Sequence, residues 1–214
     1  MKSPRASLTL GVLALAVTAS PVAAAADSGW YGGISIGQSK AKIDDARITS
    51  NLQGAGFATS INDDNRDTGY KLFGGYKFNR NFALEGGYFD LGKFGFTATT
   101  VPAGTLSGNI KLQGFNIDAV GILPIAEKFS AFGRAGLNYA DAKDSFSGTG
   151  AVNVLNRNPS KSDTNLKLGL GLQYDFTDAL GVRLEAERYR INDAVGNKGD
   201  IDLMSAGLVY RFAR

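Results

Sequence analysis

The sequence predicts an all-β fold, an eight-stranded antiparallel up-and-down transmembrane β-barrel with short periplasmic turns and longer extracellular loops. Three observations support this prediction. Apolar and polar residues alternate with a period of two in eight segments, and the connections between these segments are alternately short and long. Glycine accounts for 28 of the 214 residues and proline for only 5, which is typical of tightly curved sheets rather than of disordered chains.

Residues 1–26 have the composition of a cleavable secretory signal. Lys2 and Arg5 form a basic start, an apolar run follows, and small residues at 21–26 offer a cleavage site. The apolar run is shorter than the roughly 20 residues that a membrane-spanning helix needs. We therefore predict a signal peptide at 1–26 and one exported domain at 27–214.

Charge and composition exclude several classes of function. The chain carries a net charge of +3, but its leader holds two basic and no acidic side chains, so 21 basic and 20 acidic residues follow it. A nearly neutral domain gives no reason to expect a nucleic-acid partner. The absence of cysteine and histidine excludes disulfides, thiolate or histidine metal sites and Ser-His-Asp catalysis. We expect no catalytic residue, no cofactor and no metal ion.

Eight segments of the chain alternate apolar and polar residues. The clearest runs from Leu166 to Phe176, where every second residue is large and apolar and the residues between are Lys, Gly, Gly, Gln and Asp. Each segment is near the length of about 9–11 residues that a tilted membrane-spanning strand requires. The eight segments are 30–39, 70–78, 82–91, 110–123, 129–139, 166–176, 180–190 and 203–212.

The connections distinguish the two ends of the predicted barrel, because short turns lie at one end and long polar loops at the other. The short turns are 79–81, 124–128 and 177–179, and the long loops are 40–69, 92–109, 140–165 and 191–202. The first long loop includes Ile61–Asp67, whose oxygens suggest calcium but lack the spacing of an EF-hand. We interpret this stretch as a solvated loop.

A soluble exported barrel or sandwich would show the same alternation, so the positions of the aromatic residues are needed to distinguish it from a membrane barrel. They gather on the apolar parity near both ends of the segments, as in the girdles of a lipid-facing surface. Glycines lie mostly on the opposite parity, where a narrow interior is crowded. The set near the short turns is Phe78, Phe82, Phe129, Tyr174, Phe176, Tyr210 and Phe212, and the set near the loops is Tyr70, Tyr88 and Tyr139.

Four stretches resemble the strands of OmpA-like barrels and related small outer-membrane proteins: 29–37 (GWYGGISIG), 84–92 (LEGGYFDLG), 132–136 (FGRAG) and 207–212 (GLVYRF). The last is similar to the terminal motif that the barrel-assembly machinery reads, so the resemblance implies an assembly signal at Tyr210 and Phe212. Here Ala213 and Arg214 follow that motif. We expect the barrel domain only, without the peptidoglycan-binding domain of two-domain members.

The inward parity of the segments holds four cationic and four anionic side chains. A balanced set predicts salt bridges that fill the interior, because an unpaired buried ion is costly. The resemblance implies such a cluster at Glu85 and Arg134. A narrow water-filled channel and a ligand pocket are the alternatives for the interior. The eight residues are Lys71, Glu85, Asp118, Arg134, Lys167, Arg183, Glu185 and Glu187.

These observations predict a structural or surface-interaction barrel in the outer membrane of a Gram-negative bacterium, with a small low-conductance porin-like channel as the alternative. The partners expected are outer-membrane lipids, lipopolysaccharide, the barrel-assembly machinery and periplasmic chaperones. Arg188 and Arg190, on the outward parity, are candidates for contact with lipopolysaccharide phosphates, or lie in solvent if the strand ends earlier. Glu185 and Glu187 share a strand face, but we expect ion pairing there rather than acid–base catalysis.

Overall fold

The computed structural model describes residues 28–42, 45–192 and 198–212. The predicted signal peptide lies outside the described residues. The described residues form nine strands and one helix, which are β1 (Gly29–Ala41), α1 (Asp45–Gly54), β2 (Ala58–Asp64), β3 (Arg66–Lys77), β4 (Phe82–Val101), β5 (Gly104–Ala126), β6 (Phe129–Gly150), β7 (Ser160–Asp175), β8 (Leu180–Asn192) and β9 (Lys198–Arg211). Within the described part of the chain, no helix is long and apolar enough to span a membrane.

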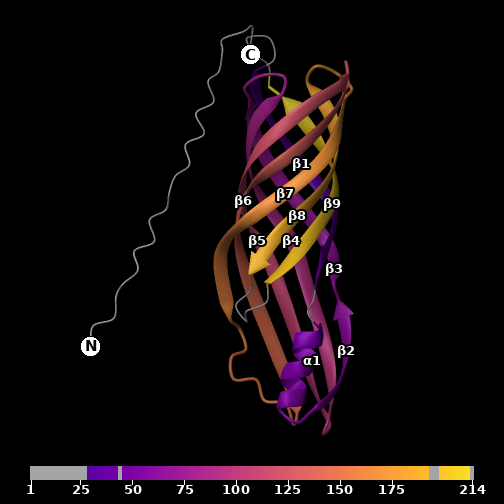
Figure 1. Ribbon diagram of the computed structural model, residues 1–214, viewed down its shortest axis with the longest axis vertical. Helices are drawn as coiled ribbons and strands as arrows, with labels where there is room; N and C mark the ends of the chain where they lie inside the picture. Colours follow the sequence, from indigo (N-terminus) through magenta and orange to yellow (C-terminus); the bar gives the residue numbers. More distant parts are fainter. Residues whose placement is uncertain (1–27, 43–44, 193–197, 213–214) are drawn as a thin grey trace, which may run out of the picture.

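Eight of these strands close into an antiparallel ring, which confirms the predicted barrel (Figure 1). Each strand pairs with its neighbours in the chain, and β1 closes the ring by pairing with β9 and β3. The short turns gather at one end of the barrel, next to the end of β9, and α1 and β2 lie beyond the other end. We call these the turn end and the loop end.

The alternation determines which side chains of each strand face outward and which face the interior. The apolar parity faces outward, where Trp30 is 66% exposed and Leu170 67%. The opposite parity faces the interior, where charged and aromatic side chains are buried. An apolar outer wall around a partly charged interior is the arrangement of a barrel in lipid, and it is the reverse of a soluble barrel.

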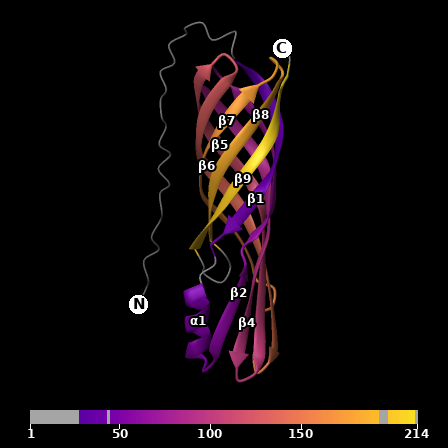
Figure 2. The ribbon, with the colours of Figure 1, turned by 90° about the vertical axis from the view of Figure 1, so that its right-hand side faces the viewer.

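The long loops predicted at 92–109 and 140–165 are corrected by the structure, because most of their residues belong to strands. β4, β5 and β6 contain 20, 23 and 22 residues, about twice what a membrane crossing needs. Their far halves form a loop-end extension with α1 and β2, comprising residues 92–101, 104–112 and 142–150 of the three strands (Figure 2). Ser, Thr and Gly make these halves look like loops, although threonine favours strands.

The loop predicted at 40–69 is corrected in the same way, because it holds α1, β2 and the start of β3. β2 pairs with the far half of β4 and lies outside the ring. β4 can serve two partners because a bulge at Asp90 to Gly92 separates the part paired with β3 from the part paired with β2. Gly92 has a φ of 85°, a conformation that favours glycine.

Candidate functional site

All eight charged side chains predicted on the inward parity lie in the barrel interior and form one charge network. They come from β3, β4, β5, β6, β7 and β8, and each is at most 5% exposed. Three of them follow one another at every second position of β8, since alternate residues of a strand share a face. The network consists of Lys71, Glu85, Asp118, Arg134, Lys167, Arg183, Glu185 and Glu187.

Arg134 is the centre of the charge network because it reaches all four carboxylates. Its Nη2 donates to Glu185 Oε1 at 2.7 Å. Its Nη1 lies 3.0 Å from Glu85 Oε2, 3.3 Å from Glu187 Oε1 and 3.6 Å from Asp118 Oδ2. The carboxylates therefore share one guanidinium, whose planar fork can serve several oxygens at once.

The two lysines complete the pairing of the carboxylates on either side of Arg134. Lys167 Nζ donates to Asp118 Oδ2 at 2.6 Å and lies 2.8 Å from Glu187 Oε1. Lys71 Nζ donates to Glu187 Oε2 at 2.7 Å and also to Glu185. Glu185 and Glu187, considered above for acid–base chemistry, are therefore both buried in ion pairs.

Arg183 joins the charge network to aromatic rings that sequence reasoning did not single out. Its Nη1 donates to Glu85 Oε1 at 2.8 Å, and its guanidinium lies over the rings of Phe132 and Phe73, 4.6 and 5.0 Å from their centroids. Tyr31 donates its hydroxyl to the same Glu85 oxygen at 2.7 Å. The inward position of these rings could have been predicted from the sequence, because Phe73 and Phe132 share the parity of the charged residues.

Apolar residues lie on both sides of the charge network. The turn-end layer lies toward the short turns, where Arg183 still lines a cavity beside Tyr31 and Val209, and the loop-end layer lies toward α1. In the loop-end layer the rings of Phe89 and Tyr189 lie 4.8 Å apart and are both fully buried. The turn-end layer is Tyr31, Phe73, Ala83, Val120, Phe132 and Val209, and the loop-end layer is Phe89, Leu91, Phe94, Leu112, Ala140, Ala142, Tyr189, Ile191, Ile201 and Leu203.

Glycines in the intervening strands let charges meet that are two strands apart. Gly169 pairs with Arg134 on one side and with Glu187 on the other. A β-carbon at Gly169 would lie 3.0 Å from the γ-carbon of each of these side chains. Gly136 takes the same place between Asp118 and Lys167. The inward glycines thus leave the space in which the ion pairs form.

The arginines proposed for lipopolysaccharide are exposed on the outer face of β8, and each has an acidic neighbour on β9. Arg188 makes a two-pronged ion pair with Asp202, at 2.6 and 2.8 Å, and Arg190 lies 3.6 Å from Asp200. This patch holds as many negative as positive charges, and its contact with phosphates stays a prediction. Both residues lie within β8, which continues to Asn192, so the alternative prediction that the strand ends before them is wrong.

The residues proposed as an assembly signal are exposed on the outer face at the end of the last strand. The rings of Tyr210 and Phe212 lie 5.4 Å apart in an edge-to-face arrangement. The amide of Phe212 donates to the carbonyl of Trp30 at 3.0 Å, which extends the closure of the ring. The two residues after Phe212 lie outside the described part of the chain. Recognition of this motif by an assembly machinery stays a prediction.

The acidic stretch considered for calcium, residues 61–67, is divided between the end of β2 and the start of β3. Side chains of β2 alternate between the faces of the strand, so Asp63 and Asp64 point to opposite sides. Asp63 faces α1, where partial burial and a hydrogen bond with Asp45 raise the pKa of its carboxyl to about 6. Among the described residues, no group of three acidic side chains is placed to hold a metal ion.

We expect this carboxyl pair to make the docking of α1 sensitive to pH. Because the pKa of Asp63 is higher in the folded protein than in an unfolded chain, its proton stabilises the docked helix, and this stability is lost as the pH rises through about 6. We expect α1 amides to be better protected at pH 5 than at pH 7, and Asp63→Asn to remove the difference. Hydrogen exchange, corrected for the intrinsic rate at each pH, measures it. Equal pH dependence in both proteins would contradict this assignment.

A family model describing an OmpA-like transmembrane domain matches residues 25–214, nearly the whole chain. The chain belongs to the OmpA-like transmembrane domain family. It is an outer-membrane β-barrel of the OmpA-like kind, as the resemblance of its strands implied. No curated protein matches the sequence significantly.

Solved structures of small outer-membrane barrels are similar to this OmpA-like chain at low identity. Neisserial surface protein A has a TM-score of 0.56 at 13% identity, over 86% of this chain and 99% of that one. OprG from Pseudomonas aeruginosa has a TM-score of 0.49 at 17% identity, over 88% and 97%. Ail from Yersinia pestis, solved with the heparin analogue sucrose octasulfate, has a TM-score of 0.47 at 20% identity, over 86% and 99%. The first of these similarities supports the same fold.

Proposed function

We propose that the protein is a closed barrel with a structural role in the outer membrane of a Gram-negative bacterium, where it presents its loop-end extension at the cell surface. The observation that supports a closed barrel is the charge network between two apolar layers. Four cations and four carboxylates neutralise one another, and all eight are at most 5% exposed. We expect no continuous water-filled path for ions along such an axis, because an eight-stranded barrel is just wide enough to be filled by side chains.

The surroundings of the barrel follow from this proposal. The apolar outer wall contacts outer-membrane lipids, and lipopolysaccharide is the partner proposed for the face that carries Arg188 and Arg190. The barrel-assembly machinery and periplasmic chaperones bring the chain to the membrane, with Tyr210 and Phe212 as the recognised motif. The loop-end extension is the part available to surface partners.

Single-channel conductance in a planar lipid bilayer tests the closed barrel. We expect near-silent traces from protein purified from outer membranes, because ions would have to cross both apolar layers as well as the charge network. An open porin in the same lipid gives the positive control, and protease protection of the strands shows that the protein is inserted. Reproducible current steps would favour the alternative, a small low-conductance diffusion channel, and would contradict the closed barrel.

A further inference from the structure

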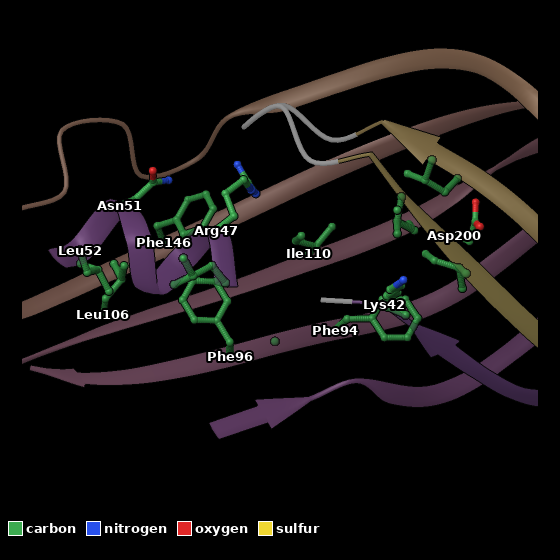
Figure 3. A pocket seen from close by; sticks show the side chains of 17 residues that line it. Lys42, Arg47, Asn51, Leu52, Phe94, Phe96, Leu106, Ile110, Phe146 and Asp200 are labelled. Atoms are coloured by element: carbon green, nitrogen blue, oxygen red, sulfur yellow. The ribbon is translucent and has the colours of Figure 1, made fainter. Parts of the chain in front are cut away.

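A second site lies in the loop-end extension, where a cavity of about 260 Å³ opens between α1 and the inner faces of β4, β5 and β6. Figure 3 shows its side chains converging from the helix and from the strands. The loop-end layer forms its floor, since Phe94, Leu112, Ile191 and Ile201 belong to both. The loop-end layer therefore separates the cavity from the charge network, none of whose residues lines it.

The cavity wall is apolar over most of its surface. The charged side chains that fill the middle of the barrel give way here to large apolar residues on the inner face of the strands. α1 covers this wall and contributes Leu52, its one buried residue among those described. The large apolar side chains of the wall include Leu52, Phe94, Phe96, Leu106, Ile110 and Phe146. An apolar, concave wall with a few polar groups is the usual form of a small-molecule site.

The few polar groups around the cavity favour an anion. Lys42 and Arg47 line it, together with one carboxylate, that of Asp200. Asp200 lies 3.6 Å from Arg190 Nε and 4.0 Å from Arg188 Nη1 on the outer face, so its charge is offset by cations outside the cavity. Lys42 is exposed at the rim of the cavity and is the cation that an anionic head group would meet there.

We propose that this cavity binds a small single-chain amphiphile with an anionic head group, for which a medium-chain fatty acid is the simplest example. The acyl chain lies along Ile110 and Phe96 toward Leu106 and Leu52, and the carboxylate lies at the rim beside Lys42. The volume agrees with a slender ligand, because it is just below the range of roughly 300–1,000 Å³ found for drug-sized molecules. This site is independent of the proposed structural role, which concerns the barrel interior.

Displacement of a fluorescent fatty acid tests the proposal. The protein purified from outer membranes is placed in lipid nanodiscs, so that detergent does not compete, and a dansyl-labelled undecanoic acid reports occupancy. We expect decanoate to displace the probe and decanol to do so at least about fivefold less well, because decanol lacks the charge that the rim attracts. Empty nanodiscs, titrated in parallel, correct for probe that enters the bilayer.

Two variants with matched controls locate the site. Leu106→Trp fills the cavity and should weaken binding by at least about tenfold, whereas Leu155→Trp changes a residue that is 95% exposed elsewhere and should not. Lys42→Glu should weaken decanoate roughly fivefold, and Lys93→Glu, on the outer face of β4, should have no effect. Circular dichroism verifies that each variant keeps its strands. Equal binding by Leu106→Trp and wild type, or equal affinity for decanoate and decanol, would overturn the proposal.

Discussion

Replacing Arg134 with methionine is expected to destabilise the barrel by about 3–5 kcal/mol, which is the usual loss when one partner of a buried ion pair is removed. We expect the loss of stability to lie near the upper end of this range, because the guanidinium of Arg134 lies within 3.6 Å of all four carboxylates of the charge network. Without it, three cations face four carboxylates between the two apolar layers. Methionine fills much of the space, so the loss measures charge more than volume.

Urea unfolding of the protein in lipid vesicles measures this effect. The single tryptophan, Trp30, lies on the lipid-facing wall, so its fluorescence reports when that wall leaves the lipid. Arg188→Met is the matched control, because it removes an exposed arginine that also pairs with an aspartate. We expect little change from the control, since exposed ion pairs contribute little. A loss below about 1 kcal/mol for Arg134→Met would show that the charge network does not hold the barrel together.

The ring of strands was predictable because a barrel in lipid repeats one simple pattern. In the segment from Leu166 to Phe176 the alternation alone indicates which side chains face lipid, and the structure has β7 at Ser160–Asp175. The same parity argument placed all eight charged residues on the inner face. Neither inference needs more than neighbouring positions in the chain, because period two is a local property of a strand.

Contacts across the interior could not be predicted in this way. Lys71 on β3 meets Glu185 and Glu187 on β8, more than 110 positions away. Which charges meet depends on the stagger of strands around the ring, which no local pattern contains. The sequence placed the glycines on the inward parity, but only the structure shows that Gly169 pairs with both Arg134 and Glu187 and separates their strands.

The loop-end extension was missed for a different reason. Its outer face carries Thr, Ser and Asn, so β4, β5 and β6 lose their apolar parity outside the lipid although the strands continue. Alternation of apolar and polar residues identifies only the part of a strand that faces lipid, so it does not identify the part of the same strand that extends beyond the membrane. The apolar cavity beneath α1 was hidden for the same reason, because Phe96, Leu106 and Phe146 alternate there with polar residues in stretches interpreted as loops.

Lys167→Met is expected to be as damaging as the loss of Arg134, at about 3–5 kcal/mol, but a second substitution should recover much of that loss. Lys167 is fully buried and lies 2.6 Å from Asp118 and 2.8 Å from Glu187. Adding Asp118→Asn restores three cations against three carboxylates. We therefore expect the double variant to be more stable than Lys167→Met alone, with a coupling free energy of about 0.5–3 kcal/mol.

The double-mutant cycle separates charge balance from packing. Urea unfolding of the wild type, both single variants and the double variant gives the coupling free energy directly. Asp175→Asn is the matched control for the second substitution, because Asp175 pairs with Arg211 near the turn end, away from Lys167. Added to Lys167→Met, it should recover nothing. If the free energies of Lys167→Met and Asp118→Asn simply add, the interior is held by packing of the side chains, and the balance of four cations against four carboxylates is not what stabilises the closed barrel.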